Sequence, residues 1–157
     1  MLKSEIENGI KNMSEENKFS IRYNKKLSKE IAERTSFMND TKWKYLFSKI
    51  KDLDCDYETF VKFLIDKKLR SFSIPDKTDF INGKYLEQYW GTCELKEIEY
   101  IFIPSQRIYE RSNRNEILEP RIENQEMNKL KKCLATGKLI EHEETEKGIF
   151  IYGYSKK

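Results

Sequence analysis

The chain has 157 residues, which suffices for one domain with a buried core and leaves little room for a second. Thirty Lys and Arg residues against 27 Asp and Glu residues give a net charge of +3 with both signs interspersed, which excludes a strong global attraction to nucleic acid or to an acidic membrane. Charged residues make up 36% of the chain, but aromatic residues supply 13%, and their large buried areas argue against overall disorder.

The cysteines and the apolar runs predict a cytoplasmic protein. Cys55, Cys93 and Cys133 form an odd set without a CxxC pair, which fits neither a disulfide framework nor a zinc site. The first residues lack an apolar run of signal-peptide length, and no later run approaches the ~18 apolar residues of a membrane span. We therefore expect a reducing compartment, with no membrane association, no metal and no cofactor.

Residues 1–37 are predicted as a helical extension, and residues 38–157 as a single domain. Apolar residues recur in the extension at helical spacing, although 19-FSIRY-23 also alternates like a strand. The next segment, 39–51, begins with residues that cap helices, and its large apolar side chains fall on one helical face. These apolar residues are Trp43, Leu46, Phe47 and Ile50.

Strand patterns follow this helix as far as residue 103. The runs 58–65 and 69–74 are rich in β-branched and aromatic residues, which is typical of strands. A turn at Asn82-Gly83 then precedes two further strands at 84–90 and 95–103.

The strand at 95–103 is predicted to present two different faces, because successive side chains of a strand point to opposite sides. One face would carry Ile98, Tyr100 and Phe102. The other would carry Glu97, Glu99, Ile101 and Ile103.

The last third of the chain is predicted to contain a loop, a helix and a hairpin. Residues 105–119 are polar without clean periodicity and predict a long loop, either mobile or functional. A helix is expected at 122–136, and the runs 138–144 and 149–154 predict a C-terminal β-hairpin. The order of elements predicts an α+β fold with a mostly antiparallel sheet and two or three packed helices.

Three patches of the sequence occur in an order that resembles a known family. They are 40-DTKWK-44, 89-YWG-91 leading into 98-IEYIFI-103, and 148-GIFIYGY-154. From Met38 to Tyr154 the chain resembles an uncharacterised bacterial family, the domain of unknown function 6678. The resemblance implies domain boundaries and a fold, and it implies no reaction.

One arrangement is typical of restriction-type nucleases. The dipeptide 75-PD-76 and the triplet 94-ELK-96 match a signature in which Asp76 and Glu94 would bind Mg²⁺ and Lys96 would act on the attacking water. Such short patterns also arise by chance in a chain so rich in charge, where they are solvated side chains at turns and strand edges. A Mg²⁺-dependent nuclease is therefore the alternative hypothesis.

Arginines in the predicted loop suggest a nucleic-acid-binding alternative. Arg107, Arg111 and Arg114 could contact phosphates. Glutamates interleaved with them dilute the positive charge, whereas nucleic-acid sites normally need a concentrated basic face. The sequence therefore disfavours nucleic acid as a partner.

The leading hypothesis is a non-catalytic binding protein. Tyr89 and Trp90 are the predicted aromatic contacts for a partner, with a place in the core as the alternative for Trp90. A strip of acidic residues is predicted beside these rings, formed by Glu97, Glu99, Glu141 and Glu143. The sequence favours a protein that masks a partner such as a toxin, as immunity and antitoxin proteins do. It predicts no oligomeric state.

Overall fold

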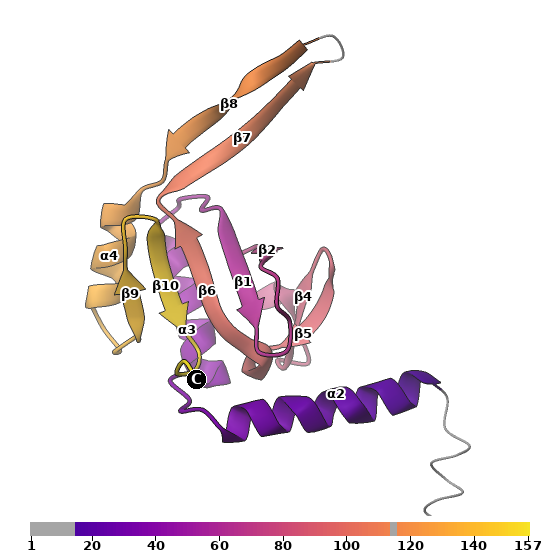
Figure 1. Cartoon of the computed structure of the whole chain (residues 1–157). Helices are drawn as coiled ribbons and strands as arrows, with labels where there is room; N and C mark the ends of the chain where they lie inside the picture. Colours follow the sequence, from indigo (N-terminus) through magenta and orange to yellow (C-terminus); the bar gives the residue numbers. More distant parts are fainter. Residues whose placement is uncertain (1–14, 114–115) are drawn as a thin grey trace, which may run out of the picture.

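The computed structural model describes residues 15–113 and 116–157, with the backbone alone at the described positions of 110–118. It has the predicted α+β fold, in which helices and antiparallel strands make up the body and one hairpin projects from it (Figure 1). The helices are α2 (Glu15–Ala32), α3 (Asp40–Asp52) and α4 (Met127–Ala135), with short 3₁₀ turns η1 (Lys77–Asp79) and η2 (Leu95–Glu97). The strands are β1 (Thr59–Phe63), β2 (Arg70–Phe72), β3 (Phe80–Ile81), β4 (Tyr85–Gln88), β5 (Gly91–Glu94), β6 (Ile98–Pro104), β7 (Gln106–Asn113), β8 (Glu116–Asn124), β9 (His142–Glu144) and β10 (Gly148–Tyr152).

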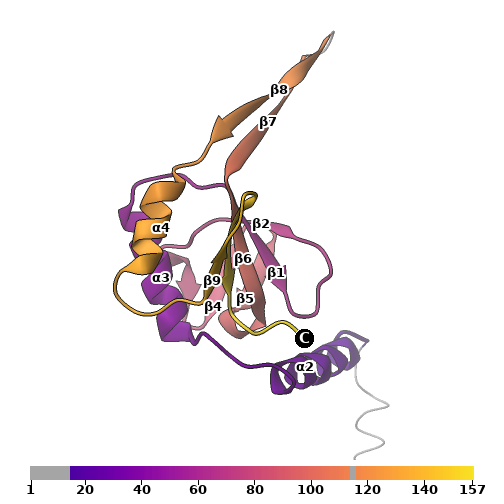
Figure 2. The same ribbon diagram turned by 60° about the vertical axis from the view of Figure 1, so that its left-hand side comes forward.

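The main sheet has five strands in the order β2-β1-β6-β10-β9, so β6 lies at its centre. Helices α3 and α4 cover one side of this sheet (Figure 2). Alternation along the strands directs aliphatic side chains toward these helices. The buried strand residues include Val61, Ile101, Ile103, Ile149 and Ile151. A smaller sheet, β3-β4-β5, packs at the edge of this core through Leu86 and Cys93.

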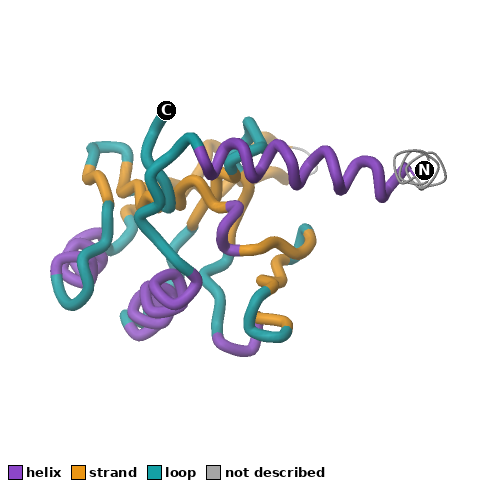
Figure 3. The backbone as a smooth tube through the Cα atoms, turned by 90° about the horizontal axis from the view of Figure 1, so that it is seen from below, coloured by secondary structure: helices purple, strands orange, loops and turns teal. Residues whose placement is uncertain are grey.

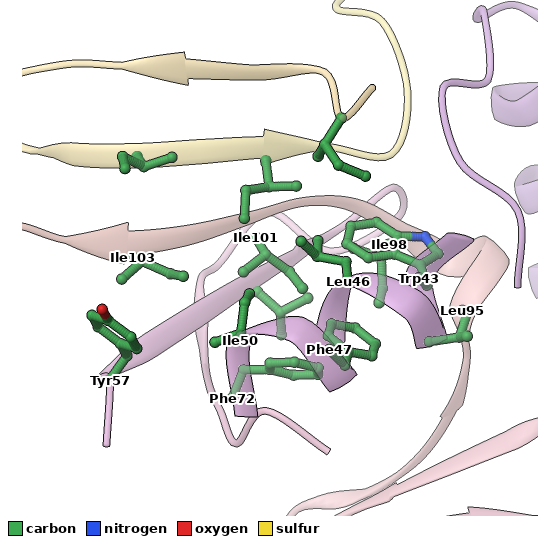
Figure 4. Packing of buried hydrophobic residues seen from close by; sticks show 14 of the residues in the cluster. Trp43, Leu46, Phe47, Ile50, Tyr57, Phe72, Leu95, Ile98, Ile101 and Ile103 are labelled. Atoms are coloured by element: carbon green, nitrogen blue, oxygen red, sulfur yellow. The ribbon is translucent and has the colours of Figure 1, made fainter. Parts of the chain in front are cut away.

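Helix α3 confirms the prediction made for residues 39–51. Asn39 caps it, because its side chain accepts a hydrogen bond from the Lys42 amide over 2.8 Å. The four apolar residues of the predicted face are all buried, and they point toward Ile98, Ile101 and Ile103 of the sheet (Figure 4). The amphipathic pattern thus correctly predicted both the helix and the face of the helix that packs against the sheet.

The predicted faces of the strand at 95–103 are wrong at its first residues. Lys62 of β1 pairs with Tyr100, but the next residue, Phe63, pairs with Ile98, so Glu99 is an extra residue in a β-bulge. Ile98 consequently points into the core with Ile101, and Glu99 lies on the side of Tyr100. Residues 95–97 form the 3₁₀ turn η2 instead of a strand.

The predicted loop at 105–119 is a β-hairpin made of β7 and β8. Strand β8 continues to Asn124, so the helix expected at 122–136 begins only at Met127. Both faces of this two-stranded ribbon lie away from the core (Figure 1). A strand without a buried face carries no alternation of polar and apolar residues, which is why periodicity missed it.

Helix α2 attaches to the body through its C-terminal half. Leu27 is buried against Leu64 and Tyr154, and the segment 19–23 is helical throughout. The C-terminus holds the end of α2 in place, because Thr35 and Ser155 exchange backbone and side-chain hydrogen bonds of 2.8 and 2.9 Å. Seen from below, the N-terminal half of α2 extends past the sheets (Figure 3). The boundary predicted at residue 38 lies between α2 and α3.

Candidate functional site

The side of the main sheet opposite α3 and α4 carries five aromatic residues on adjacent strands. Phe60 of β1 pairs with Phe102 of β6, which pairs with Phe150 of β10, and Tyr100 pairs with Tyr152 in the neighbouring row. All five side chains are partly exposed. We call these five residues the aromatic face. Helix α2 lies near one end of this side of the sheet (Figure 2).

Four of the five rings of the aromatic face, those of Tyr100, Phe102, Phe150 and Tyr152, contact one another. Phe102 and Phe150 stack with centroids 4.5 Å apart, and Tyr100 meets Phe150 edge-on at 5.5 Å and Tyr152 at 6.2 Å. These are the favourable arrangements of aromatic pairs. The rings therefore form a fixed surface that needs little ordering when another molecule covers it.

Ion pairs border the aromatic face at the end near α2. Arg34 is nearly buried, with 9% of its side chain exposed, and its Nη1 lies 2.9 Å from Glu99 Oε1. The other carboxylate oxygen of Glu99 lies 3.5 Å from Lys62 Nζ. Glu99 reaches both cations because the bulge in β6 turns it to this side.

A second charged group lies over β9 and β10. Tyr152 donates a hydrogen bond to Glu143 over 2.6 Å, and Lys156 Nζ lies 3.6 Å from the same carboxylate. The hydrogen bond from Tyr152 and the charge of Lys156 lower the pKa of Glu143. Together with Glu99 and the neighbouring rings, these residues line an open hollow of about 380 Å³.

The residues predicted to bind a partner divide between different surfaces. Glu99 and Glu143 line the hollow just described, and Glu141 is exposed just before β9. Glu97 lies elsewhere and serves as a cap, because its carboxylate accepts hydrogen bonds from the Glu94 amide at 2.6 Å and from the Tyr23 hydroxyl. The four glutamates therefore do not form one strip.

Trp90 is half-buried, so it is neither a fully buried core residue nor a fully exposed anchor. Its indole Nε1 donates to the carbonyl oxygen of Ser71 over 2.8 Å, and its ring meets Phe63 edge-on at 5.5 Å. The half-buried ring thus joins the smaller sheet to the main sheet. Its neighbour Tyr89 is 80% exposed.

The three residues of the nuclease pattern lie in two different hollows. Asp76 accepts a hydrogen bond from the Lys77 amide at 2.9 Å and starts the turn η1. Glu94 and Lys96 come together, with Oε2 and Nζ 3.1 Å apart, in a hollow that Asp76 does not line. Within residues 15–113 and 116–157, no group of three or more His, Cys, Asp or Glu side chains is placed to hold a metal ion.

The arginines of the ribbon are engaged with acidic neighbours. Arg107 lies 3.5 Å from carboxylate oxygens of both Asp56 and Glu58, and Arg121 lies 2.7 Å from Glu123. The side chain of Arg111 and the whole of Arg114 lie outside the described part of the chain. The described cations of the ribbon are therefore balanced by carboxylates.

Two of the cysteine thiols are buried in the core. Burial, with smaller effects of the Glu97 and Glu94 charges, raises the pKa of Cys93 to about 12, and burial also raises the pKa of Cys133. A thiol attacks as the thiolate, so neither environment activates a nucleophile. Cys55 is half-buried.

We expect Cys55 to be alkylated at pH 8 at least about 10-fold faster than Cys93 or Cys133, because Cys55 is more accessible and because burial raises the pKa of the other two thiols. Iodoacetamide labelling followed by peptide mass spectrometry measures the three rates. Labelling in urea provides the control, where all three should react alike. Fastest labelling at Cys93 in the folded protein would indicate an activated thiol and contradict this account.

Tyr23 provides a pH-dependent contact between α2 and the body. Burial and the hydrogen bond to Glu97 raise the pKa of Tyr23 well above its ordinary value. Because the folded state retains this proton more strongly than the unfolded chain, the stabilisation is complete below pH ~10 and is lost as the pH rises through the raised pKa.

The Tyr23→Phe variant should therefore be less stable than the wild type by about 1 kcal/mol at pH 8. Its stability should also fall less steeply between pH 8 and pH ~11, since one raised pKa has been removed. Urea unfolding across this range measures both effects. If the free energy of unfolding falls equally steeply with pH for the two proteins, folding does not raise the pKa of Tyr23.

These observations define an α+β domain with a partly exposed aromatic face on its main sheet. The chain belongs to the family of unknown function DUF6678, whose family model matches residues 27–157. The predicted family is thus confirmed, and the match begins at Leu27, the buried anchor of α2, which is earlier than the Met38 expected from the sequence. Comparisons with curated proteins and with solved structures found no match.

Among residues 15–113 and 116–157, no helix has both the length and the apolar character needed to cross a bilayer.

The aromatic face was not predicted as a site from the sequence. In 98-IEYIFI-103 and 149-IFIYGY-154, rings alternate with buried isoleucines, and this alternation would have revealed an aromatic side of both strands.

Proposed function

We propose that this protein is a non-catalytic binding protein that masks a surface of a partner protein, in the manner of a bacterial immunity or antitoxin protein acting in the cytoplasm. The observation that carries the proposal is the aromatic face, with five partly exposed rings on three adjacent strands. Aromatic residues are enriched at protein interfaces, and Tyr is among the residues that most often contribute large binding energies there. Rings that are already packed on a sheet lose little freedom on binding.

The charges around the aromatic face favour a protein over a nucleic acid as the partner. Arg34 and Lys62 pair with Glu99, and Lys156 pairs with Glu143, so both signs are present and each of these cations has a carboxylate partner. A polar border around an apolar centre is the usual anatomy of a protein interface. A nucleic-acid site would instead need a concentrated basic surface.

The nuclease alternative has weaker support. Glu94 and Lys96 lie together, but a two-carboxylate metal site also needs Asp76, which lines a different hollow. Both carboxylates already have structural partners, since Asp76 caps a turn and Glu94 pairs with two lysines. These contacts favour the structural interpretation of the motif.

The proposal is tested by purifying tagged wild-type protein and a Phe150→Ala variant from cells that make the protein. We expect one protein to be enriched with the wild type and lost with the variant, and the purified pair to bind directly and to block the partner's activity. Equal recovery with both forms would contradict docking on the aromatic face. A Mg²⁺-dependent cleavage activity that disappears in Asp76→Ala and Lys96→Ala variants would instead establish the nuclease.

A further inference from the structure

The layer formed by α3 and α4 is rich in lysine and has no role in the proposed function. It covers the side of the main sheet that lies opposite the aromatic face (Figure 2). The segments 40–52 and 126–138 contain eight lysines and three acidic residues, a net charge of +5, whereas the whole chain carries +3. The rest of the chain is therefore net negative. The eight layer lysines are Lys42, Lys44, Lys49, Lys51, Lys129, Lys131, Lys132 and Lys138.

The two helices meet at Tyr45, where lysines from both segments come together. Lys49 Nζ donates a hydrogen bond to the carbonyl oxygen of Cys133 in α4 over 3.0 Å. Lys49 Nζ and Lys138 Nζ lie 5.3 and 4.9 Å from the centre of the Tyr45 ring. The hydrogen bond from the Lys138 amide and the two nearby ammonium groups lower the pKa of Tyr45. Segments far apart in the sequence thus contribute to one positive surface.

The positive charges of this layer are not neutralised by carboxylates. Within residues 15–113 and 116–157, none of the eight layer lysines forms an ion pair. Lysines elsewhere do: Lys96 lies 3.1 Å from Glu94, and Lys156 lies 3.6 Å from Glu143. Unpaired cations on a surface can replace the counterions that surround a phosphate backbone, and the release of those counterions drives binding.

The composition of the layer favours phosphates over a protein or a lipid surface. Protein interfaces are depleted in lysine and have an apolar centre. Helices that lie on a membrane insert an apolar face into it, whereas α3 and α4 turn apolar residues such as Trp43 and Leu130 into the core. Across residues 40–52 and 126–139, all of which the structure describes, Leu139 is the single large apolar residue that is exposed.

We infer that the α3-α4 layer binds the phosphate backbone of duplex nucleic acid through its lysines, without reading the base sequence. Contacts to phosphates position a protein and carry no sequence information. Single-strand sites add rings on which bases stack, but the one ring of α3 that is not buried, Tyr45, is already contacted by Lys49 and Lys138. The aromatic face, on the other side of the sheet, remains free for the partner protein.

Fluorescence anisotropy with a labelled DNA duplex of ~24 base pairs tests this inference, in EDTA and at ~50 to ~300 mM NaCl. Wild-type affinity should fall steeply with salt. The variant Lys129→Gln/Lys131→Gln/Lys132→Gln should raise the dissociation constant at least about 10-fold at ~50 mM NaCl and reduce the logarithmic salt slope by about 2. Glutamine preserves the helix, because its helix propensity is close to that of lysine.

The matched control is Lys18→Gln/Lys96→Gln/Lys156→Gln. It removes the same charge from lysines that have carboxylate partners and lie outside the layer. It should change the dissociation constant less than about 2-fold, because paired lysines release few counterions. Equal weakening by the two triple variants would overturn the inference, since net charge alone would then account for binding.

Far-UV circular dichroism shows whether the layer variant keeps its fold. If it does not, the single variants Lys131→Gln and Lys138→Gln replace it, each expected to raise the dissociation constant about 3-fold. A wild-type protein that does not bind the duplex at ~100 μM and ~50 mM NaCl would overturn the inference. Tighter binding to phosphatidylserine vesicles or to polyglutamate than to the duplex would overturn it equally, in favour of a membrane or an acidic protein. None of these results bears on the aromatic face, which a Phe150→Ala variant tests separately.

Discussion

Replacing Gly148 by alanine is expected to lower the free energy of unfolding by about 3 kcal/mol or more, through backbone strain and overpacking. Gly148 has φ +151°, which side chains rarely tolerate. An alanine methyl group there would also lie 2.3 Å from the carbonyl oxygen of Ile103 and 2.7 Å from Cα of Pro104. Both are backbone atoms of β6, so the start of β10 would have to move away from its neighbour.

Gly91 provides the matched control for this substitution. Its φ is +144°, but an added methyl group would meet no atom within 4 Å. Gly91→Ala should therefore cost only the backbone strain, about 1–2 kcal/mol. Urea unfolding of the two variants measures the difference, which reports the close approach of β10 to β6. Equal losses would show that the pairing at Gly148 can relax at no cost.

Replacing Phe102 by alanine is expected to weaken binding to the partner at least about 30-fold, because it removes the central ring of the aromatic face and rings of this kind contribute about 2 kcal/mol or more at interfaces. Phe102 stacks on Phe150 and pairs with Phe60, so its loss also leaves its neighbours less well ordered. The variant should still fold, since Ile101 and Ile103 on the other side of β6 form the buried core.

Tyr89→Ala is the control for this second prediction. Tyr89 is a large exposed ring outside the aromatic face, and the sequence predicted it as a contact residue. Its removal should change the affinity less than about 2-fold, as for most residues outside a binding hot spot. Calorimetric titration with the purified partner measures both variants. A larger loss from Tyr89→Ala than from Phe102→Ala would place the interface around Trp90 instead.

The sequence predicted those elements that have one buried face. Residues 39–51 carried a helical apolar stripe together with a cap at Asn39, and both appear in α3. The C-terminal hairpin was also predicted correctly, because the apolar run at 149–154 forms the buried strand β10. In both cases local pattern and tertiary packing agree, which makes local pattern informative.

The elements that were missed lack such a pattern. The ribbon has no buried face. The β-bulge at Glu99 adds one residue to β6, so Ile98 and Glu99 lie on the opposite sides of the sheet from those that strict alternation predicts. Side-chain contacts between residues far apart in the chain could not be predicted from the sequence either. Glu97 was predicted as a surface charge, but it accepts a hydrogen bond from Tyr23 on a distant helix, a contact that exists only once α2 has packed against the body.

Hydroxyl-radical footprinting of the purified complex tests most directly whether the protein acts through its aromatic face. Mass spectrometry would compare the oxidation of each ring in the free protein and in the complex with its partner. We predict strong protection of Phe102, Phe150 and Tyr152, while Tyr89 stays as reactive as in the free protein. Protection of Tyr89 with no change at the three aromatic-face residues would contradict the account.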